Sequence, residues 1–263
     1  MSKYETAKLV ILHIPHSSKI IPQDILKSFI LRESELQAEL IRMTDSYTEE
    51  LFDIKHPLVA MIIYPVSRLV VDPERFIDDQ DEPMSEKGMG VVYTKTSFGH
   101  ELREPLSKKQ RESLILEYYV PHHKKLTKAV TDAITTYEKC IIIDCHSFPS
   151  TLLPSESDQS PNRPDICIGT DEFHTPAWIE EMTVNLFTKH GYKTDLNRPF
   201  SGSMVPATYY RINPRVMSVM IEVNRSLYMN DETGLKNSEF SQLKNTLHMI
   251  IQSLIGTAYE SGS

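Results

Sequence analysis

The apolar positions of the chain fall in short continuous runs, and such runs predict buried β-strands. Their apolar character is continuous rather than alternating, as expected for a sheet that is covered on both faces. The runs occupy residues 8–14, 58–66, 68–72, 139–147, 165–170 and 216–224.

Helical signals lie between these runs. Ser46 and Glu49 are spaced as a capping box, which predicts a helix that begins near residue 46. Ser107 and Gln110 form a similar pair ahead of a helical stretch that extends to about residue 138. Pro121 interrupts that stretch and should kink it or split it in two.

Two further helices are predicted in the second half of the chain. Thr175 before Pro176 is a suitable N-cap and first helical position, and Gly191 should end this helix. Residues 237–256 have the pattern of an amphipathic helix. Because strands alternate with helices and no repeat or linker is visible, we expect residues 1–263 to form a single α/β domain.

Two segments, 73–106 and 149–164, have little periodicity and are rich in Pro, Ser, Asp, Glu and Gly. We therefore expect both to be long loops. Loops of this length in a compact domain tend to be lids or mobile segments that serve function.

Composition narrows the class of protein. The 263 residues carry a formal net charge of −8, which argues against nucleic acid as the main partner but allows a small anionic substrate in an arginine-lined pocket. No apolar run approaches the ~20 residues of a membrane span, and the N-terminus has no signal-peptide pattern. The cysteines Cys140, Cys145 and Cys167 form no paired framework, so we expect reduced thiols in a cytoplasmic protein.

Polar side chains stand where four of the predicted strands end, and the sites of open α/β sheets form at that edge. Pro15 should end the first strand, so that His16 lies just beyond its carboxyl end. His13 lies within the apolar run and has the position of a packed core residue. Asp144 and His146 are two residues apart, so on a strand they share a face and the carboxylate can orient the imidazole. The alternative is a strand-end turn with local hydrogen bonds.

Glu222 lies between apolar residues of the last predicted strand. A buried carboxylate is costly unless it is paired or bound to a metal, and burial raises its pKa toward the range of a general base. The alternative is a structural ion pair with Arg225 or another arginine.

Arg68 and Arg75 flank Asp72 in the motif at 67–76. Pocket arginines bind carboxylates with their planar fork, although a structural Arg–Asp pair is the alternative. Asp45 either caps a helix or supplies an acid to the site. His122 and His123 adjoin Pro121 and either reach a cleft or lie on the surface.

Two histidines and a carboxylate together form a catalytic zinc set that leaves one coordination position for water. In that arrangement Glu222 takes the proton of the water, and an arginine stabilises the oxyanion. Such ligand sets also accept other divalent ions.

Seven short motifs make the chain resemble the N-formylglutamate amidohydrolase family, from about residue 10 to 230. They are PHSS at 15–18, TDSYTEELF at 44–52, SRLVVDPERF at 67–76, DCHS at 144–147, IGT at 168–170, RPFSGS at 198–203 and IEVNRSLYM at 221–229. The resemblance implies a three-layer α/β/α sandwich with a mostly parallel mixed sheet, phosphorylase/hydrolase-like and related to zinc carboxypeptidases.

The resemblance also implies an activity, namely hydrolysis of the amide bond of a small, carboxylate-bearing substrate such as N-formyl-L-glutamate. By position in the motifs, His16, Asp45 and His146 are expected to hold one Zn²⁺ per chain. Glu222 is expected to be the general base and Arg68 to stabilise the oxyanion. The residues expected to bind the substrate are Arg75, Arg198, Asn224 and Arg225.

The chain departs from the family pattern near the expected pocket. Ser18 and Ser203 stand where glycine is usual, and the pattern SRxxxDxNR is here SRLVVDPERF, which brings in Pro73 and Glu74. These changes leave the expected ligands in place but bear on the substrate. Two alternatives therefore stay open: a zinc peptidase or N-acyl amino acid deacylase of different specificity, and a non-catalytic relative that binds acids.

Overall fold

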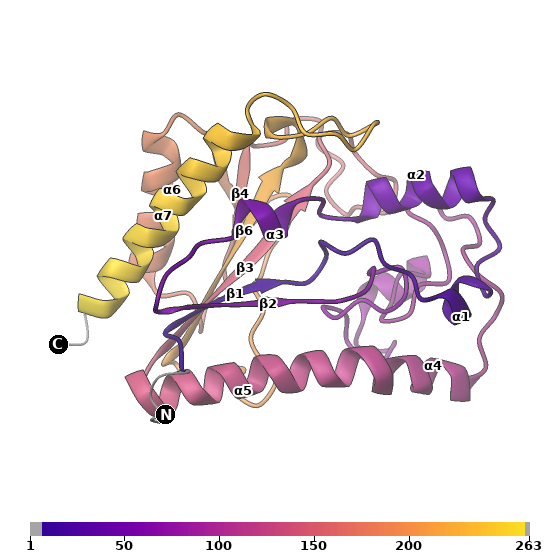
Figure 1. Ribbon diagram of the computed structural model, residues 1–263, viewed down its shortest axis with the longest axis horizontal. Coiled ribbons are helices and arrows are strands. Elements are labelled where there is room, and N and C mark those ends of the chain that lie inside the picture. Colours follow the sequence, from indigo (N-terminus) through magenta and orange to yellow (C-terminus); the bar gives the residue numbers. More distant parts are fainter. Residues whose placement is uncertain (1–6, 261–263) are drawn as a thin grey trace.

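The computed structural model describes residues 7–260, and a mixed sheet forms its centre (Figure 1). The order of the strands is β2-β1-β3-β6-β4-β5, and only the β4–β6 pair among the described strands is antiparallel. The strands are β1 (Val10–Ile14), β2 (Val59–Ile63), β3 (Cys140–Phe148), β4 (Ile166–Gly169), β5 (Thr194–Leu196) and β6 (Val216–Asn224).

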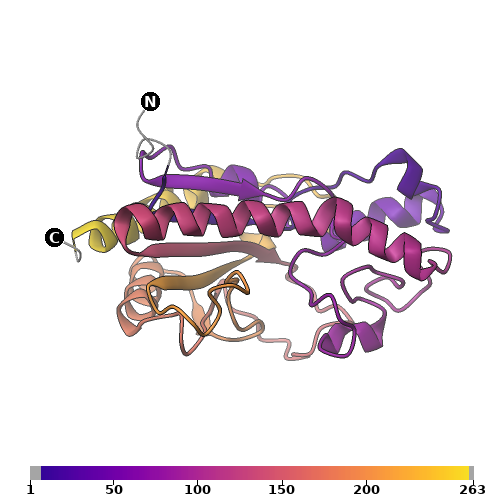
Figure 2. The ribbon, with the colours of Figure 1, turned by 90° about the horizontal axis from the view of Figure 1, so that it is seen from below.

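Helices cover both faces of the sheet. Helices α6 (Ala177–Lys189) and α7 (Phe240–Glu260) lie on one face together with α3 (Thr48–Leu51), and α5 (Val120–Tyr137) lies on the other (Figure 1). Helix α4 (Lys108–Leu114), the π-helical segment η2 (Ile115–Tyr119) and α5 follow one another along a single axis (Figure 2). The three-layer α/β/α sandwich with a mostly parallel mixed sheet is thus confirmed.

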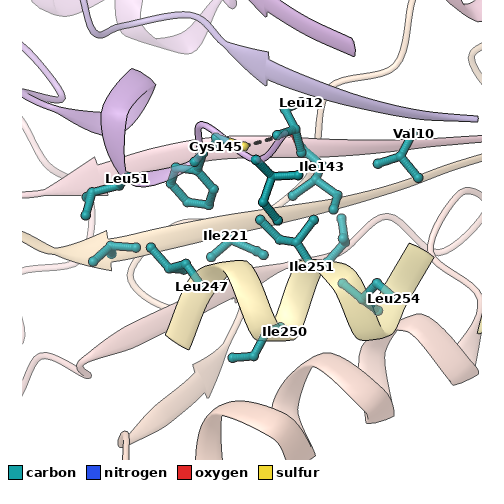
Figure 3. Packing of buried hydrophobic residues seen from close by; sticks show 14 of the residues in the cluster. Val10, Leu12, Leu51, Ile143, Cys145, Ile221, Leu247, Ile250, Ile251 and Leu254 are labelled. Atoms are coloured by element: carbon teal, nitrogen blue, oxygen red, sulfur yellow. Dashed lines mark hydrogen bonds between the residues drawn. The ribbon is translucent and has the colours of Figure 1, made fainter. Parts of the chain in front are cut away.

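Each face of the sheet has its own apolar core. Side chains of α7 such as Leu247 and Ile251 pack on Ile143 and Ile221 of the central strands (Figure 3). On the other face, α5 contributes Leu126, Val130 and Ala133 to a smaller cluster with Ile11 and Ile142 of β1 and β3. These contacts bury both faces of the central strands, which explains why their sequences are apolar without interruption.

A second region extends beyond the carboxyl ends of the strands (Figure 1). It contains α1 (Gln23–Leu26), α2 (Glu33–Met43), the 3₁₀ turn η1 (Pro83–Lys87) and the loop residues around them. Two apolar clusters of this region, one around Tyr64 and Val71 and one around Leu40 and Tyr93, give it a core of its own. The long segment 73–106, expected to be a loop, is therefore packed rather than free. The 3₁₀ turn Arg225–Leu227 (η3) follows β6 directly.

One predicted strand, 68–72, is wrong. These residues form a turn in which Arg68 Nη2 donates to Asp72 Oδ2 at 2.7 Å. In a strand, residues four apart are separated by about 13 Å, so this ion pair requires a folded backbone. The apolar residues between them are buried in the clusters beyond the sheet, and their burial alone accounts for the apolar run.

The helix predicted to begin near Ser46 begins two residues later, without the predicted capping box. The helix is the short α3, which begins at Thr48, and its N-cap residue is Tyr47 in the left-handed region with φ 67°. Ser46 Oγ has no hydrogen-bond partner in the described part of the chain. The backbone N–H of Asp45 donates instead to the carbonyl of His16 at 2.9 Å, which fixes the chain before the helix starts.

Other helix signals are confirmed or nearly so. The capping box of Ser107 and Gln110 is present, and the helix that follows is split by a π-helical segment just before Pro121. The helix expected from Thr175 begins one residue later, with Pro176 as its N-cap, and Gly191 follows its end with φ 87°. Helices α1 and α2 were not predicted.

Among residues 7–260 there is no helix of sufficient length and apolar character to cross a membrane. The N-terminal residues 1–6, on which the expectation of no signal peptide partly rests, lie outside the described residues.

The close approach of Gly169 in β4 to neighbouring backbone gives a stability prediction. A Cβ at Gly169 would lie 2.3 Å from the carbonyl oxygen of Gly202 and 2.4 Å from Met220 Cε. We expect Gly169→Ala to lower the free energy of unfolding by roughly 1–3 kcal/mol, measured by urea denaturation, because backbone must move.

Gly256 in α7 is the matched control. In the described structure nothing lies within 4 Å of a Cβ added there, so Gly256→Ala should be neutral or stabilise by up to about 1 kcal/mol. Equal effects of the two substitutions would contradict the packing described for β4.

Candidate functional site

A cluster of polar side chains lies at the carboxyl edge of the sheet, where β1, β3 and β6 end side by side. His16 follows β1, His146 belongs to β3 and Glu222 to β6, and the last two are register partners on adjacent strands. Asp45 joins them from the junction between α2 and α3. All four are at least nine-tenths buried, so the sheet brings together the residues expected from the sequence.

The spacing of three of these side chains suits a metal ion. His146 Nδ1 lies 3.2 Å from Asp45 Oδ2, and His16 Nδ1 lies 3.8 Å from the same oxygen. Zinc bonds of 2.0–2.2 Å in a tetrahedron separate neighbouring ligand atoms by about 3.3 Å. Ligand-competent atoms of His16, Asp45 and His146 all lie within 4.8 Å of one another.

Outer carboxylates set the direction in which each imidazole points. His16 Nε2 donates to Asp72 Oδ1 at 2.8 Å, and His146 Nε2 lies 3.2 Å from Asp144 Oδ1. Carboxylates of this kind fix the tautomer and ring orientation of metal-bound histidines. His16 Nδ1, which remains, is buried and has no hydrogen-bond partner among residues 7–260. It is thus free to bind an ion.

The core histidine of β1 belongs to the same network. His13 Nδ1 donates to Asp144 Oδ1 at 2.8 Å, and its Nε2 lies 2.8 Å from His122 Nε2 on α5. Burial first, and the neighbouring imidazoles second, lower the pKa of His122 to about 2, so this ring is neutral. The Asp144 carboxylate thus contacts both His13 and His146.

Arg225 lies behind Asp45 rather than in an open pocket. Its Nη2 donates to Asp45 Oδ1 at 3.0 Å, and its Nη1 donates to the carbonyl of Arg42 at 2.6 Å. Its Nε and Nη2 also reach Ser147, and the residue is 2% exposed. Arg225 therefore holds one oxygen of Asp45 and leaves the other, Oδ2, facing the histidines.

The charges of the cluster favour a cation. Burial alone would lower the pKa of both histidines. Asp72 and Asp45 nevertheless raise the pKa of His16. Glu74, Asp144 and Asp45 raise the pKa of His146 well above its usual value. Burial would likewise raise the pKa of Asp45, but the two imidazoles and Arg225 hold it far below its usual value. The site thus stabilises positive charge between its carboxylates, as a divalent ion would supply.

Glu222 behaves differently from the other carboxylates. Burial, and then repulsion from Asp45 and Glu74, raise its pKa to about 8. Its Oε2 is buried without a hydrogen-bond partner in the described chain. A carboxylate with a pKa near neutrality, next to a cation site, has the property that a general base requires.

The arginines expected to act on substrate divide into two groups. Arg68 donates through Nε and Nη2 to Asp72 and lies close enough to His16 to oppose its protonation, and Arg75 Nε lies 3.6 Å from Asp72 Oδ2. Arg75 Nε is buried without a hydrogen-bond partner within residues 7–260. Both are at the edge of the cluster.

Arg198 and Asn224 are occupied elsewhere. Arg198 is 43% exposed on its side chain and donates to Asp158 Oδ2 at 2.9 Å. Asn224 accepts from the backbone of Ser226 and donates to the carbonyl of Pro164, so it shapes the turn after β6. The structure does not bring these two side chains to the ligand cluster.

Sequence reasoning missed several residues of the site. Glu74, noted only as a departure from the family pattern, has carboxylate oxygens 3.1 and 3.3 Å from His146 Nε2. Its charge and its place two residues after Asp72 were the available signals. Tyr93, whose hydroxyl donates to Asp72 at 2.7 Å, lies in a segment expected to be a loop, and the sequence contained no signal for its role.

Comparison with known proteins shows which family the chain belongs to. The fold is a three-layer α/β/α sandwich with a buried His–carboxylate cluster at the carboxyl edge of its sheet. A model of the N-formylglutamate amidohydrolase family matches residues 9–229. The chain belongs to the N-formylglutamate amidohydrolase family, and its class of reaction is hydrolysis of a carbon–nitrogen bond.

Solved structures have the same fold. The crystal structure of N-formylglutamate amidohydrolase from Ralstonia eutropha JMP134 aligns with a TM-score of 0.86 and 20% identity, over 97% of this chain and 95% of that chain. A gene product of Agrobacterium tumefaciens aligns with a TM-score of 0.66 and 16% identity, over 97% and 94% of the two chains. No curated protein matches the chain.

The raised pKa of Glu222 gives a prediction for the metal-free protein. The folded state holds this proton up to about pH 8, whereas the unfolded state releases it near 4.5. The free energy of unfolding of wild type should therefore fall, relative to Glu222→Gln, as the pH rises between these values.

Urea denaturation in chelator at about pH 5 and pH 8 measures the difference. We expect the stability advantage of Glu222→Gln to grow by up to a few kcal/mol at the higher pH. An advantage that is the same at both pH values would show that Glu222 ionises normally in the fold.

Proposed function

We propose that the protein is a zinc-dependent amidohydrolase that cleaves the amide bond of an N-formyl or N-acyl amino acid, such as N-formyl-L-glutamate. One observation carries the proposal. His16 Nδ1 and Glu222 Oε2 are both buried in one cluster, and neither has a hydrogen-bond partner among the described residues. An ion at His16 and a water at Glu222 would satisfy both atoms, which otherwise carry a desolvation cost.

His16, Asp45 and His146 would hold the ion, each already oriented by a partner. Asp72 fixes the His16 ring and Arg225 holds the second oxygen of Asp45. The 3.2 Å between His146 Nδ1 and Asp45 Oδ2 is close to the separation of two ligands on one zinc ion. When bound, zinc would lower the pKa of a water and polarise the substrate carbonyl. Three protein ligands leave a position open for that chemistry.

Glu222 would act first as the general base and then as the general acid. Its carboxylate accepts a proton from the attacking water and delivers it to the leaving nitrogen, which restores the ionised form. The pKa of about 8 in the free cluster makes the protonated form accessible, and a cation nearby favours the ionised form needed before attack. Because Glu222 adjoins His146 in register, the same strand pair places base and ligand together.

Arginines at the edge of the cluster would meet the charges of the substrate. Arg68, held in place by Asp72 and Tyr93, presents a fixed positive charge to the oxygen of the attacked carbonyl. Arg75 would pair with the substrate carboxylate, and its buried Nε without a hydrogen-bond partner in the described structure supports this role. Arg198 would contribute only if its ion pair with Asp158 opened.

Several expectations stay predictions: one zinc ion per chain, a single domain, a cytoplasmic location, and Asn224 as a residue that lines the pocket. We assign Arg225 the positioning of Asp45 in place of the expected substrate contact. A deacylase or peptidase of other specificity uses the same chemistry, so a panel of N-formyl, N-acyl and peptide substrates separates it from the proposed activity.

The metal assignment can be tested by elemental analysis. Wild type should contain about one zinc per chain, and His146→Ala should lose both the metal and the activity because two ligands cannot hold the ion. Glu222→Gln should keep the metal and lower kcat by about 10²–10⁴-fold, as expected for removal of a general base. Retention of zinc and activity in His146→Ala would refute the ligand set.

The two candidate carboxylate-binding arginines form a matched pair. Arg75→Gln should raise KM for an N-formyl amino acid by about 10- to 100-fold, the loss of one charged hydrogen bond, with kcat changed less. Arg198→Gln should leave KM close to wild type because its partners are Asp158 and Asn162. The reverse result in steady-state kinetics would move the carboxylate site to Arg198.

A further inference from the structure

Glu74 stands where the family pattern SRxxxDxNR has asparagine, and its carboxylate points into the ligand cluster. Its Oε2 lies 3.1 Å from His146 Nε2 and 3.8 Å from His16 Nδ1, and its Oε1 lies 3.6 Å from His13 Nδ1. The side chain is 16% exposed. An amide at this position would add no charge, whereas glutamate adds a second carboxylate beside the histidines.

The distance from His16 Nδ1 is the informative one. Asp45 Oδ2 and Glu74 Oε2 lie at the same 3.8 Å from this buried atom, which has no hydrogen-bond partner in the described chain. An ion on His16 Nδ1 would therefore have a carboxylate oxygen of each residue in its neighbourhood. We infer that Glu74 is a fourth protein ligand of the metal, so that the site has two imidazoles and two carboxylates. This inference rests on the proposed metal site.

The backbone at Glu74 is fixed on both sides, which a ligand requires. The N–H of Glu74 donates to Asp72 Oδ1 at 3.0 Å, and His123 Nε2 donates to the carbonyl of Pro73 at 2.7 Å. The His123 ring stacks on Tyr119 of the π-helical segment at 4.0 Å between centroids. Asp72 and His123, which hold the backbone at Pro73 and Glu74, thus act together to orient one carboxylate.

A competing assignment places Glu74 in a second cation group with His13 and Asp144, whose ligand atoms also lie within 4.8 Å of one another. In that group His13 Nδ1 already donates to Asp144, and its Nε2 is occupied by His122. The 2.8 Å between His13 Nδ1 and Asp144 Oδ1 is a hydrogen-bond distance, shorter than the roughly 3.3 Å that separates two ligand atoms on one zinc ion. The unpaired nitrogen belongs to His16, and Glu74 is therefore assigned to the ion held there.

Four protein ligands fill a tetrahedral ion and leave no place for water. The ion must then accept a fifth ligand, and two carboxylates favour ions that tolerate higher coordination, such as Mn²⁺, Fe²⁺ or Co²⁺, more than a two-histidine, one-carboxylate site does. Two carboxylates also balance the charge of a divalent ion. A glutamate at this position would thus influence which ion the chain retains and how tightly.

The test uses full-length apoprotein titrated with Co²⁺, whose visible absorption is weak at five-coordination and several-fold stronger at four-coordination. Wild type should bind one Co²⁺ per chain with the weak band. Glu74→Gln and Glu74→Asn should each give the stronger band and bind roughly 10- to 100-fold more weakly in competition with a chelator. Unfolding by urea confirms that each variant is folded.

Two controls separate ligation from neighbouring effects. Asp144→Asn removes a carboxylate that contacts His146 but not the ion, so affinity should fall while the band keeps its wild-type strength. Glu49→Gln changes an exposed carboxylate that contacts only Ser17 among the hydrogen bonds described here, and should alter neither quantity.

Three results would overturn the inference. The wild-type band in both Glu74 variants would mean that Glu74 acts on His146 from outside the coordination sphere. Two Co²⁺ ions per wild-type chain would place it in the second group. A wild-type chain that binds no Co²⁺ and no zinc would defeat the proposed function itself, and not merely the role of Glu74.

Discussion

The buried carboxylate of Asp72 is the constraint on which the site depends. Its Oδ1 accepts from His16 Nε2 and the Glu74 backbone, and its Oδ2 accepts from Arg68 and the Tyr93 hydroxyl. The residue has no exposed surface, and its charge is tolerable only because these donors surround it. One side chain thereby ties the first strand to the region beyond the sheet and fixes the direction of the His16 imidazole.

A cluster with this charge distribution carries a thermodynamic cost in the absence of an ion. Asp45, Asp72 and Asp144 are held ionised by histidines and arginines, whereas Glu222 is left without a counter-charge of its own. Removing a partner from a buried ionic network is strongly destabilising, so each member constrains the rest. The same arrangement that makes the fold depend on pH also makes it receptive to a divalent cation.

The fold was largely predictable because its main signals are local. Continuous apolar runs located five of the described strands, and capping and glycine signals located the ends of several helices. The errors came from residues whose conformation is set by particular ion pairs and hydrogen bonds, which a pattern of apolar positions does not signal. The turn at 68–72 is apolar like a strand but is folded by the Arg68–Asp72 pair, and Ser46 has a capping spacing that the Asp45–His16 hydrogen bond overrides.

The site was predictable to the extent that strand ends mark it. His16, His146 and Glu222 follow from the position of each in or after an apolar run, and the structure brings them together. The role of Arg225 could not be read from the sequence, because its partner Asp45 is 180 residues away. Glu74 was visible only as an unusual residue, since its direction depends on how Asp72 and His123 hold the backbone.

The strand order has a consequence for the biosynthesis of the protein. β6 is the last strand in the sequence, yet it occupies the middle of the sheet between β3 and β4, and it carries Glu222 next to Arg225. While the chain is being synthesised, the position between β3 and β4 therefore stays unfilled until residue 224 has emerged. The cluster of His16, Asp45, His146 and Glu222 is therefore complete only once most of the chain has been synthesised.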